Sequence, residues 1–454
     1  MTFSSRPSPV IPRPIWVLIA FNFWLLPEST HCATFSVSDG DVAALKSAIV
    51  VASSNGQDDV IQLAEKGIYV LTAIDNSVNG QNGLPVMGAD GGKSVTIDGR
   101  GAVIRRDTAA NTAKFRILCV GDGAHVTISR LTVSDGYVDS TNRVAGGGGG
   151  ILNYRGNLNL ERCTLTGNFA ITGGGLLNYG ATGTTTSIVS ECAIHHNTAN
   201  YYGGGIYNYG SVNTGLTKLT VINTTICDNV ANFFGGGITE DGLDGPAPLT
   251  IASCTFSGNN SGPGKDIWHY WGEIRIGHTI LNDFDALYSG GAVGSDGYNL
   301  TYGTNNGWLN SKTDGHATDL KLDPAGLQDN GGPTKTIALL PGSPVVDAGS
   351  NTVAPARDQR GYLRNGRSDI GAFEFDGQLL RLVGIARDND IVVSCEVVEG
   401  KRYRLQRKLK ITESMWQDIF GVNDLVATGN NTESITDPGA ISFGQAFYRV
   451  LLLP

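Results

Sequence analysis

The sequence lacks an excess of basic residues, a paired cysteine motif and, beyond residue 33, a long apolar run. Its 33 basic and 42 acidic residues give a formal net charge of −9 and are spread without a long run of one sign. This balance disfavours a nucleic-acid or anionic-membrane partner. Because no CxxC pair or Cys/His metal spacing occurs, we expect no structural zinc site.

Residues 1–33 predict a secretory signal peptide. Arg6 and Arg13 precede the apolar run 15–26, and Ala33 is a candidate last residue before cleavage. The apolar run is too short to span a bilayer, so no membrane span is expected. The sequence therefore predicts a secreted or cell-surface (extracellular) protein, and it carries no LPxTG motif that would indicate an anchor.

A repeat extends from residue 148 to residue 259. Each copy has a glycine triplet, a short apolar-to-polar step, and an apolar residue three places before an asparagine. The triplets begin at Gly148, Gly173, Gly203 and Gly235, so they lie 25, 30 and 32 residues apart (173−148, 203−173, 235−203). This period is typical of solenoids. Short β-branched runs bounded by Gly, Asn and Ser predict one coil of strands per repeat, paired in parallel with the next coil.

Four asparagines stand at equivalent positions at the ends of these repeats. They are Asn168, Asn197, Asn229 and Asn259. Parallel strands of adjacent coils lie roughly 4.8 Å apart, so equivalent side chains stack along the axis. We interpret the column as a structural asparagine ladder at a tight corner, in preference to a ligand site.

Two stretches resemble known families. The alternation of GGGIxN with FxxN, literal at residues 256–259, resembles the repeats of chlamydial polymorphic outer-membrane proteins and the wider right-handed parallel β-helix superfamily. This resemblance implies a secreted or surface-exposed protein. The runs DLKLDPAGLQDNGGPTKTIALLPGSPVVDAGS and DQRGYLRNGRSDIGAFEF resemble the closing segment of bacterial choice-of-anchor Q domain proteins. Neither resemblance implies a set of catalytic residues.

The domain organisation follows from these patterns. The predicted fold class is all-β: a signal peptide at 1–33, an N-terminal cap and right-handed parallel β-helix at 34–318, and a closing segment at 319–377. Residues 378–454 lose the triplets and predict a small C-terminal antiparallel β-sandwich. An amphipathic helix is expected at 42–52, where it would cover the first coil.

Removal of Cys32 with the signal leaves six cysteines. An even number in an exported chain permits disulfides. Cys163 and Cys192 occupy equivalent positions on adjacent coils, where stacked side chains point the same way. We favour free thiols that pack in the core, since a buried cysteine behaves as a small hydrophobic residue.

Acidic residues are densest at Glu240, Asp241 and Asp244, where earlier repeats carry asparagine. Carboxylates there are candidates for acid and base catalysis, and Asp241 with Asp244 for calcium; no other metal or cofactor is expected. β-Helix lyases need a basic residue and a cation to stabilise the enolate charge, and hydrolases need clustered carboxylates. No such constellation recurs at the coil spacing, and a solvated loop is the competing interpretation.

Aromatic residues recur beside the triplets. The ligand-binding candidates are Tyr154, Tyr179, Tyr209, Tyr201, Tyr202, Trp268 and Trp271. An exposed aromatic ladder can stack on sugar rings, whereas an inward-facing ladder is core packing. The direction of a residue beside a corner is not determined by one sequence.

These observations favour a monomeric β-helix protein that binds or adheres to polysaccharide or cell-surface glycan. A polysaccharide lyase or glycoside hydrolase on the same scaffold is the second hypothesis, and it leaves open whether the protein is an enzyme. A structural spacer that presents the C-terminal module is the third. The fold alone does not decide between them.

Overall fold

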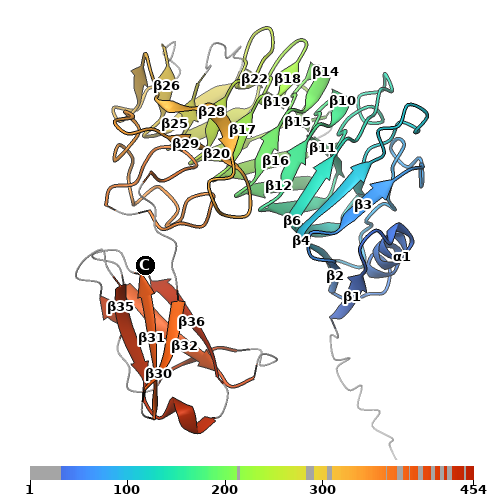
Figure 1. Cartoon of the computed structure of the whole chain (residues 1–454). Helices are drawn as coiled ribbons and strands as arrows, with labels where there is room; N and C mark the ends of the chain where they lie inside the picture. The colour runs from blue at the N-terminus through green and yellow to red at the C-terminus, as the bar shows by residue number, and fades with distance from the viewer. Residues whose placement is uncertain are drawn as a thin grey trace, which may run out of the picture. The chain divides into compact units, whose positions relative to one another are not determined.

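The computed structural model describes residues 32–181, 183–211, 215–282, 291–303, 309–364, 366–375, 382–387, 389–396, 402–410, 415–419, 424–426, 432–443 and 446–453. The predicted signal peptide lies outside these residues, apart from Cys32 and Ala33. The described chain is all-β except for helix α1 (Val42–Ala52) and the short 3-10 helix η1 (Ala440–Phe443). Strands between residues 33 and 317 wind into the predicted right-handed parallel β-helix (Figure 1). In the described part of the chain, no helix has the length and hydropathy to cross a membrane.

Three parallel sheets form the walls of the β-helix. The long sheet contains β1 (Ala33–Val37), β2 (Asp59–Leu63), β3 (Ile68–Leu71), β4 (Ser94–Arg106), β6 (His125–Ser134), β8 (Asn157–Glu161), β9 (Thr164–Thr166), β12 (Thr184–Ser190), β13 (Ala193–His195), β16 (Leu216–Ile222), β17 (Thr225–Cys227), β20 (Leu249–Ala252), β21 (Thr255–Ser257), β23 (Glu273–Gly277), β24 (Ile280–Leu281), β25 (Ala292–Gly297), β26 (Leu300–Tyr302) and β27 (Gly315–Ala317). The middle sheet contains β5 (Leu118–Val120), β7 (Ile151–Tyr154), β11 (Leu176–Gly180), β15 (Ile206–Gly210), β19 (Ile238–Asp241) and β22 (Ile267–Tyr270). The short sheet contains β10 (Phe169–Thr172), β14 (Thr198–Tyr202) and β18 (Val230–Ala231).

The glycine triplets lie at the corner that leads into the middle sheet, and close packing of the coils requires them. Gly173 has a left-handed φ of +62°. A Cβ atom on Gly174 would lie 2.4 Å from the carbonyl oxygen of Gly204 in the next coil. Only glycine permits both the backbone conformation and this approach. The triplet therefore sets how closely successive coils stack.

The predicted asparagine column is a continuous ladder of side-chain hydrogen bonds. Each Nδ2 donates to the Oδ1 of the next rung, at 2.9 Å from Asn168 to Asn197, 3.0 Å from Asn197 to Asn229 and 3.0 Å from Asn229 to Asn259. The same oxygens accept backbone N–H groups, each at 3.1 Å. The ladder thereby satisfies buried donors at a corner where the strand hydrogen bonds are interrupted.

Aliphatic columns fill the interior of the coils. Ile151, Leu176, Ile206, Ile238 and Ile267 form one such column and are at most 1% exposed. Helix α1 has the predicted bounds and covers the first coil with Leu45 and Ile49. All seven cysteines are free thiols, and all except Cys32 are buried. This agrees with the preference for core thiols over disulfides.

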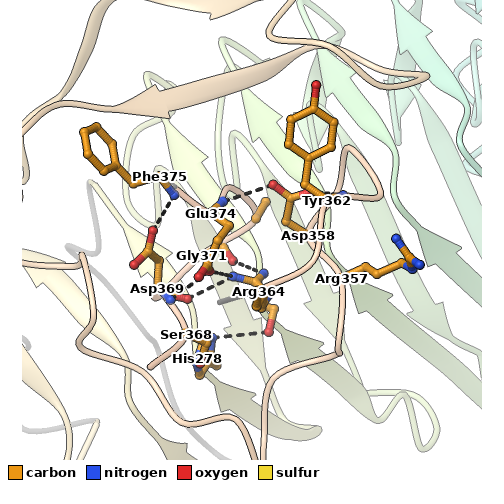
Figure 2. A network of polar contacts seen from close by, with 12 residues as sticks. His278, Arg357, Asp358, Tyr362, Arg364, Ser368, Asp369, Gly371, Glu374 and Phe375 are labelled. Carbon is orange, nitrogen blue, oxygen red and sulfur yellow. Dashed lines mark hydrogen bonds and ion pairs between the residues drawn. The ribbon is translucent and has the colours of Figure 1, made fainter. Parts of the chain in front are cut away.

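The closing segment packs against the long sheet and is held by a buried polar network (Figure 2). After the antiparallel pair β28 (Leu322–Gln328) and β29 (Thr336–Leu339), the chain reaches the DQRGYLRNGRSDIGAFEF run. Arg364 donates to Glu374 at 3.1 Å and to the Gly371 carbonyl at 2.7 Å. The Oδ2 atom of Asp358 accepts the backbone N–H of Glu374 at 3.1 Å. Because these charges bond one another and the local backbone, we assign this motif a structural role.

His278 joins the β-helix to the closing segment, as Figure 2 shows. Its Nε2 atom accepts the backbone N–H of Ser350 at 3.0 Å, so this nitrogen carries no proton. Nδ1 lies 3.3 Å from the Ser253 hydroxyl. Burial and the nearby Arg364 lower the pKa of His278 from 6.5 to about 3. The imidazole is therefore neutral in the folded protein.

The C-terminal module has two antiparallel sheets. One contains β30 (Leu382–Arg387), β31 (Asp390–Glu396) and β35 (Thr432–Asp437), and the other contains β32 (Arg402–Lys408), β33 (Gln417–Asp418), β34 (Leu425–Val426) and β36 (Phe447–Leu453). Val393 and Ile435 from the first sheet share a core cluster with Leu405 from the second. The predicted β-sandwich is therefore present.

We predict that Asn229→Ala destabilises the β-helix. The substitution removes a fully buried rung and leaves the N–H donors of Asn197 without their acceptor, at a cost of about 2–4 kcal/mol. The measurement is the thermal unfolding midpoint, with the exposed Asn232→Ala as the control. Equal midpoints for both variants would contradict a structural role for the ladder.

The neutral His278 predicts acid destabilisation. Below pH 6.5 the unfolded chain binds a proton at this residue, whereas the folded chain does so only near pH 3. The free energy of unfolding therefore falls as pH decreases through this window. Thermal midpoints measured from pH 7 to pH 4 should fall less steeply for His278→Gln than for the wild type. If the thermal midpoints of both proteins fell equally with pH, His278 would not contribute to the acid destabilisation.

Candidate functional site

The outer face of the middle sheet presents two columns of side chains. In register along β7, β11, β15, β19 and β22, the first column is Leu152, Leu177, Tyr207, Thr239 and Trp268. The second is Tyr154, Tyr179, Tyr209, Asp241 and Tyr270. Side chains in a strand alternate between faces, so the residues between these columns point into the coil. On β19 and β22 the two columns form the floor of a groove.

The groove has a volume of about 480 Å³. Its lining residues are Arg143, Tyr202, Phe234, Thr239, Asp241, Leu243, Asp244, Trp268 and Tyr270. The ring of Phe234 stacks between its neighbours, with its centroid 5.9 Å from that of Tyr202 and 4.3 Å from that of Trp268. One wall is therefore an aromatic surface built from three successive coils.

Arg143 reaches the groove from a loop that precedes β7. The guanidinium of Arg116, which is fully buried, donates to the carbonyls of Val144, Ala145 and Gly147 at 2.9–3.0 Å. These bonds fix the loop over the sheet. The Arg143 guanidinium carbon then lies 4.5 Å from the ring centroid of Tyr209, and the side chain approaches the Asp241 carboxylate at 3.9 Å. The loop thus places a cation beside the floor.

Two carboxylates are held by tyrosines of the neighbouring coil. The hydroxyl of Tyr207 donates to Asp241 and that of Tyr209 to Asp244, each at 2.7 Å. Burial raises the pKa of Asp241, and the Tyr207 hydrogen bond opposes that shift. Burial and the bond to Asp244 raise the pKa of Tyr209 to about 12, so this phenol is a donor at neutral pH. Both carboxylates are therefore fixed acceptors.

Glu240 does not belong to this acidic group. It alternates with Asp241 along β19, so it points into the coil, where it contacts the Nδ1 atom of His269. Both side chains have no exposed surface, and burial raises the pKa of Glu240 to about 7. Among the described residues, Glu240 Oε1 and His269 Nε2 have no hydrogen-bond partner. The pair continues the inward column of Asn153, Asn178 and Asn208.

The other predicted ligand-binding residues lie on the outer face of the middle sheet or at its edges. Tyr154 and Tyr179 stack at 5.4 Å, are half-buried on the outer face of the sheet and pack against the buried cluster that contains Leu152 and Leu177. Tyr201 and Trp271 are 45% and 50% exposed at the edges of the groove region. The structure therefore gathers Tyr202, Trp268, Asp241 and Asp244 in one groove.

Calcium at Asp241 and Asp244 stays a prediction. Calcium takes six to eight oxygen ligands, and Asp241 and Asp244 each accept one tyrosine hydroxyl. Within the described part of the chain, no three His, Cys, Asp or Glu side chains come together as a metal site.

Sequence reasoning missed Arg143 and the pairing of His269 with Glu240. The IWHY run at 267–270 pairs with ITED at 238–241, so it forms one more coil of the middle sheet after the four repeats. It lacks a glycine triplet, so the triplet spacing does not identify it as a repeat. The apolar-x-polar alternation was the signal that could have identified it. No local pattern indicated Arg143.

Comparison with known proteins identifies no family for this chain. No family model and no curated protein matches the chain. Among solved structures, the chain is similar to the pectin methylesterase from Aspergillus niger, with 14% sequence identity and a TM-score of 0.36 over 63% of this chain and 85% of that one. At this level of similarity the comparison carries no argument about function.

We predict that Glu240→Asn combined with His269→Asn stabilises the protein. The pair buries two ionisable groups with unpaired atoms, whereas asparagines at these rungs can extend the amide bonds seen from Asn153 to Asn178 at 2.9 Å. We expect the free energy of unfolding to rise by about 1–3 kcal/mol. The double alanine variant is the control and should be less stable than the wild type. A lower thermal midpoint for the asparagine variant would show that the Glu–His pair itself stabilises the coil.

Proposed function

We propose that this protein is an exported or cell-surface β-helix protein that binds polysaccharide in the groove over β19 and β22. The observation that carries the proposal is the combination of an aromatic wall, formed by Phe234 and Trp268, with fixed polar groups in a single groove of about 480 Å³. Carbohydrate ligands combine apolar ring faces with many hydroxyl groups. A site with aromatic surface and a few oriented polar groups complements both.

Each polar group has a specific task in this proposal. Apolar C–H faces of a sugar ring pack against the aromatic wall, and its hydroxyl groups donate to Asp241 and Asp244. Arg143 supplies N–H donors to ring or hydroxyl oxygens. Because tyrosine bonds and stacking hold these side chains before a ligand arrives, binding loses little side-chain entropy.

The charge of the groove favours neutral sugars. Asp241 and Asp244 contribute two carboxylates against the single guanidinium of Arg143. Polyuronates would bring further carboxylates to a surface that is already negative, which weakens their association. We therefore propose neutral polysaccharides as the ligand class, in a protein of the polymorphic-repeat and choice-of-anchor Q type.

A polysaccharide-cleaving enzyme is the second candidate. The observation in its favour is the Arg143 guanidinium 3.9 Å from the Asp241 carboxylate, since cleavage requires a carboxylate and a charge-stabilising group in one cleft. The raised pKa of Asp241 fits a proton-transfer role. The spacer hypothesis has no comparable observation to support it.

We predict that Asp241→Asn and Arg143→Ala each weaken glycan binding at least about tenfold, because each removes a charged hydrogen-bonding group worth about 1.5–3 kcal/mol. Binding of the full chain to immobilised cellulose, mannan, xylan and polygalacturonate is the measurement, with the exposed Asp319→Asn as the control.

Released reducing ends and the ultraviolet absorbance of unsaturated uronate are followed in the same samples. Product formation that Asp241→Asn abolishes would favour the enzyme. A chain that neither binds nor cleaves any of these polymers would contradict both candidates.

A further inference from the structure

Four of the exposed large apolar side chains of the described chain lie at two opposite edges of the groove. Tyr201 and Phe233 are 45% and 50% exposed at the corner before the middle sheet. Leu243 and Trp271 are 53% and 50% exposed at the corner after it. Exposed apolar side chains that cluster around a groove indicate a contact surface. We call these pairs the front rim and the back rim.

Both rims are continuous with the groove lining. The Tyr201 ring lies 6.1 Å from that of Tyr202, which lines the groove, and stacks on Phe233 at 5.1 Å. On the other side, Trp271 meets the groove residue Tyr270 edge to face at 6.5 Å. Leu243 lines the groove itself. A ligand that leaves the groove in either direction therefore meets apolar side chains.

Trp271 has an unusual backbone for its size. It adopts a left-handed φ of +67°, which is uncommon for a bulky side chain and costs roughly 1–3 kcal/mol. Gly180, Gly210 and Gly242 occupy the equivalent place in the three preceding coils. Arg155 occupies it in the coil of β7 and also has a left-handed φ, of +62°. The chain thus places a half-exposed indole at a corner where the three preceding coils have glycine.

The two rims lie at opposite ends of the strands beneath the groove. Toward the N-terminal coils, Val144, on the same loop as Arg143, packs against the cluster that contains the buried Leu152 and Leu177. The direction from the front rim to the back rim runs along the strands, and β19 alone spans roughly 13 Å at about 3.3 Å per residue. One sugar ring cannot contact both rims.

We infer that the groove binds an internal segment of a polysaccharide chain. The segment lies over β19 and β22, parallel to these strands, and contacts Phe233 at one end and Trp271 at the other. The groove proper takes the central sugar, and the two rims take the sugars on either side. This inference rests on the proposed function and deepens it. It states that the site binds the interior of a neutral polysaccharide chain, and not a monosaccharide or the end of a chain.

The test uses the full chain and β-1,4-linked gluco-, manno- and xylo-oligosaccharides from monomer to hexamer, titrated by calorimetry. For whichever of the three oligosaccharide series binds, we expect the affinity to rise steeply with the number of sugars. It should then level off once the oligosaccharide reaches both rims. Phe233→Ala and Trp271→Ala should weaken binding of the hexamer by roughly threefold to tenfold, yet leave the shortest bound oligomer within about twofold. Tyr302→Ala, an equally exposed aromatic on the long sheet, is the matched control and should change neither.

The possible outcomes separate the two proposals. If the monomer binds as tightly as the hexamer, or if the rim variants weaken all lengths equally, the chain-crossing inference is overturned while glycan binding stands. If no oligomer of any length binds, both are overturned. Because Trp271→Gly relieves the left-handed backbone, it should raise the thermal midpoint while it weakens the hexamer, so loss of binding is distinguishable from loss of folding.

Discussion

The stacking of one coil on the next is the constraint on which the rest of this structure depends. Two devices set it: glycine triplets, whose missing Cβ atoms let backbones approach, and side-chain amides that bond from rung to rung. Both act at corners, where strand hydrogen bonds are interrupted and buried donors would otherwise be unpaired. Once the corners are in register, every strand residue is aligned with its counterpart above and below. The columns of the middle sheet follow from that alignment.

The candidate site arises where these columns change composition. From β7 to β15 the inward column consists of asparagines, and on β19 and β22 Glu240 and His269 replace them. Along the outward column tyrosine gives way to Asp241. The tyrosines of the preceding coil then hold the new carboxylates, because one coil spacing suits a phenol-to-carboxylate hydrogen bond. A repetitive scaffold thus builds a specific groove through a few departures from its own repeat.

The buried charges of this protein have different roles. Arg116 and Arg364 are almost completely buried, yet their Nη atoms donate to backbone carbonyls and, for Arg364, to the Glu374 carboxylate, and these bonds hold a loop and a segment in place. Such groups stabilise only when their hydrogen bonds are satisfied. Arg143 differs because its side chain is 40% exposed beside an open groove, and its neighbours are aromatic rings and a carboxylate. This contrast is why we assign the buried charges of the closing segment a structural role and treat the groove as the candidate site.

The sequence by itself determined the solenoid, the asparagine ladder, helix α1 and the candidates Asp241, Asp244, Tyr202 and Trp268. These are local or periodic features, and the coil repeat converts their spacing directly into position. Only the tertiary structure decided which face each residue occupies: Glu240 and Asp241 are neighbours in sequence but point to opposite sides of β19. It also decided the position of Arg143, which lies 98 residues before Asp241 (241−143). Arg143 reaches the groove because the buried Arg116 holds its loop there, a long-range contact that no periodicity records.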